Sequence, residues 1–91
     1  MNQQVQIIVT MPIKDNLLKL FIQKSAESAG IEGHAHAPNN NTIKIIALGT
    51  SQAIDDFIDL IYAGYGQSIP EAVAVEPYEP KKDFRGLFRI L

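Results

Sequence analysis

The spacing of apolar residues switches twice between a two-residue and a three- to four-residue period, and this alternation constrains the fold most strongly. Residues 5–10 carry β-branched side chains at alternate positions, which predicts a strand. Residues 18–29 then repeat apolar or small side chains every three or four positions, which predicts a helix capped by Asp15 and ended by Gly30. The first predicted unit is therefore a strand followed by a helix.

The second unit has a hairpin before its helix. Residues 31–37 alternate small or apolar with polar side chains, and residues 42–48 are rich in β-branched side chains, so both segments are predicted strands. The intervening PNNN, residues 38–41, favours a tight turn that joins them as a hairpin. Thr50 is the predicted cap of the second helix, and Gly64 is its predicted end. The expected buried stripe of this helix is Ile54, Phe57, Ile58 and Ile61.

Two short segments complete the predicted sheet, namely residues 72–76 and 87–91, with the loop PYEPKKD between them. The order is then βαββαβ with one extra strand. Such an order predicts an α/β (α+β) ferredoxin-like sandwich, in which two helices cover one face of an antiparallel four- to five-stranded sheet and leave the other face open. The 91 residues, 46% of them hydrophobic, are expected to form one domain over residues 1–91.

Charge and composition exclude several classes of function. The 8 basic and 10 acidic residues give a net charge of −2, which argues against binding to nucleic acid. The sequence contains no cysteine, so thiolate catalysis and cysteine-ligated metals are excluded. Neither a phosphate-binding Gly-Lys-Ser/Thr motif nor a dinucleotide fingerprint is present. We therefore expect a soluble, cytoplasmic protein that has no cofactor and does not bind membranes.

The middle of the chain, AGIEGHAHAPNNNTIKIIALGTSQAIDDFIDLIYAG, and its final FRIL resemble the acylphosphatase family. That resemblance implies the ferredoxin-like fold and, as ligand, a small anionic acyl phosphate that is hydrolysed to carboxylate and phosphate. In the family, the amides of a glycine-containing loop and an arginine hold the phosphate, and an asparagine orients the attacking water. Amides at a helix start and a forked guanidinium both suit an anion.

Counting from the matched glycines shows where this chain departs from the family. Counting back from Gly30 places the arginine position at Lys19, and counting forward from Gly33 places the asparagine position at Ala37. The loop positions, none of which is glycine, are Ile13, Lys14, Asp15, Asn16, Leu17 and Leu18. Because lysine lacks the planar fork and alanine cannot hold a water, we expect lost or strongly reduced hydrolysis in a protein that acts as a binding or interaction module.

Two alternatives remain open. In the first, the chain is a divergent acylphosphatase in which Lys19 or Lys14 replaces the arginine and a turn asparagine such as Asn39 places the water. In the second, Glu32, His34 and His36, which alternate along one strand and so share one sheet face, bind a metal ion. The sequence does not identify a protein partner, although an exposed edge strand could pair with another copy of the chain.

Overall fold

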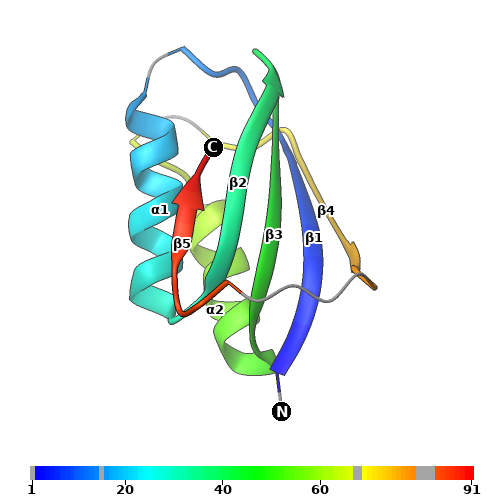
Figure 1. Ribbon diagram of the computed structural model, residues 1–91. Helices are drawn as coiled ribbons and strands as arrows, with labels where there is room; N and C mark the ends of the chain where they lie inside the picture. Colours follow the sequence, from blue (N-terminus) through cyan, green and yellow to red (C-terminus); the bar gives the residue numbers. More distant parts are fainter. Residues whose placement is uncertain (1, 15, 67–68, 80–83) are drawn as a thin grey trace.

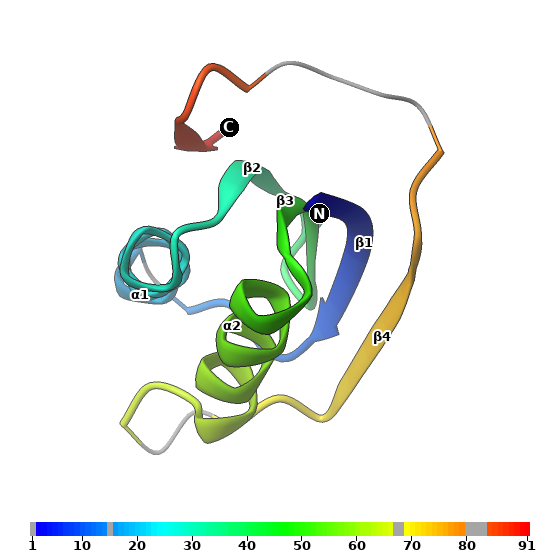
Figure 2. The same ribbon diagram turned by 90° about the horizontal axis from the view of Figure 1, so that it is seen from below.

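The computed structural model describes residues 2–14, 16–66, 69–79 and 84–91. Within these ranges the chain forms two helices and a five-stranded sheet of order β4-β1-β3-β2-β5 (Figure 1). The elements are β1 (Asn2–Thr10), α1 (Leu17–Ala29), β2 (Glu32–Asn39), β3 (Thr42–Thr50), α2 (Ser51–Ala63), β4 (Ala72–Pro77) and β5 (Phe88–Ile90). Both helices lie on the same face of the sheet (Figure 2), so the predicted ferredoxin-like sandwich is confirmed.

The sheet is mixed, which corrects the prediction of a purely antiparallel one. Strand β1 is antiparallel to β3 and β4, and β2 is antiparallel to β3, but β5 is parallel to β2. The cause is the path of the chain after β4. Strand β5 begins at the end of the sheet where β4 stops, so it runs opposite to β4 and in the direction of β2 (Figure 1).

The core lies between the helices and the sheet. Strands β1 and β3 supply Ile7 and Ile45, which are completely buried, and α2 supplies Phe57. The ring of Phe57 meets that of Phe88 edge-on, with ring centroids 6.0 Å apart, so the last strand is anchored in the core. The removal of these apolar side chains from water is the main contribution that holds the helices on the sheet.

Two of the predicted helix ends are confirmed. The Thr50 hydroxyl accepts a hydrogen bond from the Ala53 amide at 3.1 Å, which confirms the predicted cap of α2. Gly30 ends α1 in a left-handed conformation, as predicted. At the start of α1 the N-cap residue is Asn16, whereas the predicted cap, Asp15, lies outside the described residues. Neither of these helices is long and apolar enough to cross a membrane.

Gly33 on β2 leaves no room for a side chain next to β3. A Cβ atom built on Gly33 would lie 1.8 Å from the Ile46 carbonyl oxygen, and the φ of this glycine is +144°. Only glycine fits such a position. In this register His34 lies opposite Ile46 on β3 and beside Arg89 on β5, on the sheet face turned away from the helices, which we call the outer face.

Candidate functional site

The segment between β1 and α1, where the family has its phosphate loop, is hydrogen-bonded to the β2–β3 turn. The Met11 amide donates to the Asn41 carbonyl at 3.0 Å, and the Ile13 amide donates to the Asn40 carbonyl at 2.7 Å. Between them, Pro12 has no amide hydrogen. The amide hydrogens of Met11 and Ile13 are therefore bonded to the turn, and Pro12 has none. No amide hydrogen of residues 11–13 is available to an anion.

The asparagines of the turn are used locally. The Asn39 side-chain oxygen accepts a hydrogen bond from the Asn41 amide at 2.8 Å, which is the arrangement of an Asx turn. The carbonyls of Asn40 and Asn41 in turn accept from the loop, as described above. The side chain of Asn39 is exposed and serves the turn in this structure.

Lys19 and Ala37, the positions predicted for the family's arginine and asparagine, line the same cavity. The cavity lies on the helix-facing side of the sheet and measures about 10 Å³, which is close to the minimum for a single water molecule. Its other lining residues are Ile22, Ala35, His36, Ile43 and Ile90. Lys14 is exposed and does not belong to this lining. The lining thus includes a lysine but no arginine and no asparagine.

The candidate metal ligands do not come together. One carboxylate oxygen of Glu32 accepts a hydrogen bond from the Gly86 amide at 2.7 Å. The ring of His34 meets the ring of Phe84 at a centroid distance of 5.8 Å, and His36, two residues further along β2, lies opposite Lys44 on β3. Across the described part of the chain, no group of three or more histidine, aspartate or glutamate residues is placed to hold a metal ion.

Comparison with known proteins decides the family. The acylphosphatase family model matches residues 3–90, nearly the whole chain. The chain belongs to the acylphosphatase family. The match includes both the segment from β1 to α1 and the closing strand.

Individual acylphosphatases agree with this assignment. The chain is 27% identical to an acylphosphatase of Caldivirga maquilingensis over 84 residues, which are 91% of this chain and 88% of the relative. The acylphosphatase of Bacillus subtilis has a TM-score of 0.87 at 21% identity, covering 100% of this chain and 99% of that one. An acylphosphatase of Coxiella burnetii also has a TM-score of 0.87, at 17% identity, covering 99% of this chain and 93% of that one. Similarity at these low identities shows a shared fold.

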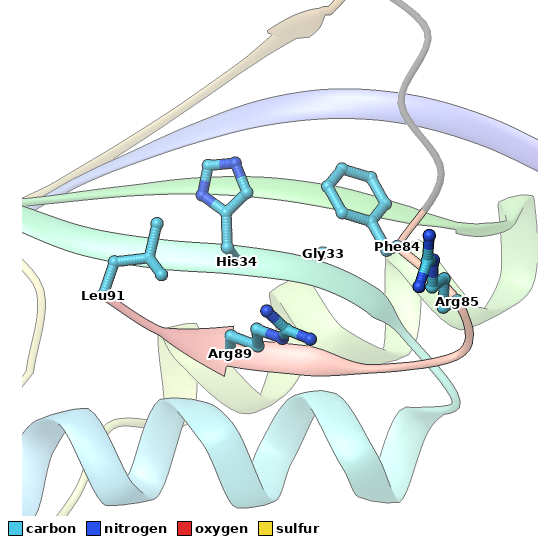
Figure 3. Close-up of a pocket in the computed structure, with 6 residues that line it drawn as sticks. All are labelled: Gly33, His34, Phe84, Arg85, Arg89 and Leu91. Carbon is cyan, nitrogen blue, oxygen red and sulfur yellow. The ribbon is translucent and has the colours of Figure 1, made fainter.

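A second and larger pocket, which the sequence analysis did not identify, lies on the outer face beside β2 and β5 (Figure 3). It measures about 370 Å³ and is lined by Gly33, His34, Phe84, Arg85, Arg89 and Leu91. One signal was available in the sequence, because Arg85 and Arg89 are the only arginines of the chain, and one precedes its closing strand while the other lies within it. The outer face is also less open than predicted, since Ile46 on this face is only 7% exposed.

Proposed function

We propose that this protein is an acylphosphatase-family member whose hydrolysis of acyl phosphates is lost or strongly reduced, and that it acts by binding. The observation that carries the proposal is the lining of the cavity shared by Lys19 and Ala37, which includes no arginine and no asparagine. The cavity is also bordered largely by aliphatic side chains, which provide neither a hydrogen-bond donor nor a positive charge for an anion.

The substitutions remove two separate contributions to catalysis. A guanidinium forks onto two phosphate oxygens, whereas the Lys19 ammonium acts as a point charge. Ala37 cannot hydrogen-bond and orient a water molecule. In other enzymes, the loss of one preorganised donor lowers kcat by about 10²–10³, so the loss of both groups is expected to leave little turnover.

The proposal is tested by an assay of acetyl phosphate hydrolysis, with the Bacillus subtilis acylphosphatase as the positive control. We expect at least about a hundredfold lower kcat/KM than the control, because donor and water-orienting groups are both missing. Activity equal to that of the control would refute the proposal.

A divergent acylphosphatase is the second candidate, and it is favoured by the position of Lys19 in the cavity next to Ala37. In this proposal Lys19 or Lys14 takes the place of the arginine that holds the phosphate of a small acyl phosphate, and a turn asparagine such as Asn39 places the water. The bond between the Asn39 side chain and the Asn41 amide would then have to break. Replacement of Lys19 and Lys14 by alanine would abolish any hydrolysis measured, whereas Lys24→Ala, on the exposed side of α1, would leave it unchanged.

A further inference from the structure

The pocket of about 370 Å³ on the outer face, which we call the outer pocket, concentrates positive charge in a chain that is negative overall. His34 and Arg89 are neighbours in the register of the parallel β2–β5 pair, and their side chains stand on the same side of it (Figure 3). Arg85 enters from the turn before β5, so both arginines of the sequence border the pocket. With a net charge of −2 for the whole chain, two arginines at one pocket are a local exception, partly offset by the Glu32 carboxylate that accepts from the Gly86 amide.

The turn that carries Arg85 is held firmly against β2. The Gly86 amide donates to a Glu32 carboxylate oxygen at 2.7 Å, and the Gly33 amide donates to the Leu87 carbonyl at 2.9 Å. Arg85 itself has a φ of +55°, and it is the only non-glycine residue of the described ranges with a positive φ. Such a conformation persists where its surroundings fix it, and it is common at ligand sites. The pocket wall is therefore a built feature.

The rest of the wall is apolar and partly aromatic. The rings of Phe84 and His34 meet edge-on, with a centroid distance of 5.8 Å and an interplanar angle of 67°, and Leu91 stands on the other side of His34 (Figure 3). A volume of about 370 Å³ falls within the range of small-molecule sites. The pocket thus has room for an organic group next to an anion.

We propose that the outer pocket binds a phosphate monoester that carries a flat apolar group. A phosphate monoester has a charge near −2 at neutral pH, which two guanidinium groups can match, and each guanidinium can fork onto its oxygens. The flat group would pack against Phe84 and His34, because aromatic faces and edges attract one another. The site is separate from the Lys19 cavity, which lies on the helix-facing side of the sheet, and its occupation does not depend on the function proposed above.

Binding is tested by calorimetry with three probes: phenyl phosphate, inorganic phosphate and phenol. We expect phenyl phosphate to bind at least about tenfold more tightly than inorganic phosphate or phenol, because it alone can contact both the arginines and the aromatic rings. Arg89→Gln is expected to weaken its binding at least about tenfold. Arg89→Lys should recover part of the loss, since it restores charge without the fork. Lys24→Gln removes one positive charge from the exposed side of α1 and should leave the Kd unchanged.

The location of the ligand is followed by amide NMR, which also shows whether each variant is folded. Phenyl phosphate should shift the signals of Gly33, His34 and Leu91, and Lys19→Gln should leave its affinity unchanged. Loss of binding in Lys19→Gln but not in Arg89→Gln would place the anion in the cavity lined by Lys19 and Ala37 and overturn the proposal. Equal affinity for inorganic phosphate and phenyl phosphate, or no binding at millimolar concentrations, would overturn it as well.

Discussion

Lys19 of α1 and Ala37 of β2 line the same cavity although they lie on different elements. Ile22, one turn after Lys19, is buried against the sheet, so the packing of α1 fixes the lysine at this place. Counting from Gly30 and Gly33 without gaps therefore identified two positions that meet in space. The two positions that the count predicts for the family site therefore lie next to each other in the fold.

Restoring the two residues is the most direct check of this view. The double variant Lys19→Arg/Ala37→Asn is expected to raise the kcat of acetyl phosphate hydrolysis by roughly tenfold or more, because each restored group contributes to transition-state stabilisation. The single variants should gain much less, since a held phosphate and a placed water act together. Lys24→Arg is the matched control for the added guanidinium. No gain in the folded double variant would show that the loop, rather than these two residues, limits activity.

Asn39→Ala separates a structural role of this side chain from a catalytic one. The variant loses the acceptor of the Asn41 amide and should lower the free energy of unfolding by about 0.5–1.5 kcal/mol. Urea denaturation measures this change. Asn40→Ala is the control, because the backbone carbonyl that accepts from Ile13 is kept. If Asn39→Ala instead leaves stability unchanged and lowers hydrolysis, the asparagine takes part in the reaction.

Gly33→Ala is expected to destabilise the protein by more than about 3 kcal/mol, because the new Cβ atom would collide with the Ile46 carbonyl. Gly30→Ala is a matched control. Its φ of +76° is also unfavourable for alanine, but a Cβ atom there meets nothing within 4 Å, so a cost of about 1–2 kcal/mol is expected. Thermal and urea unfolding of both variants measures the difference, and equal costs would show that β2 and β3 can separate.

Thr50→Ala should lower the free energy of unfolding by about 1 kcal/mol through loss of the bond to the Ala53 amide. Thr50→Ser keeps a hydroxyl and should cost only a fraction of this amount. Ser51→Ala changes the next residue, which lies inside α2 and is exposed, and provides the baseline. A loss of stability in Ser51→Ala as large as in Thr50→Ala would contradict the assigned cap.

Local patterns predicted the elements well because their causes are local. The two-residue period of β1 and the Thr50 cap of α2 depend on side chains within a few positions of one another. The direction of β5 could not be predicted in this way, since it depends on where the chain emerges after β4. The same holds for the bonds from the Met11 and Ile13 amides to the turn, because they join backbone atoms that are distant in sequence and carry no signature in the side chains.

The outer pocket escaped prediction for a related reason. Arg89 and His34 become neighbours only through the parallel pairing of β5 with β2, a pairing that the sequence did not indicate. The absence of arginine at the Lys19 position drew attention to the family site, whereas both arginines of the chain lie elsewhere. The roles assigned to Lys19 and Asn39 stay predictions until the assays above are carried out.

Strand β5 connects the interior of the protein with its outer surface. Along its three residues, Phe88 is buried against Phe57, and Arg89 turns outward to the pocket. Detachment of this short edge strand would therefore open the core and dismantle the pocket in one event. A ligand bound to Arg89 in the pocket would oppose this detachment. The free energy needed to detach β5 would therefore rise with the concentration of that ligand.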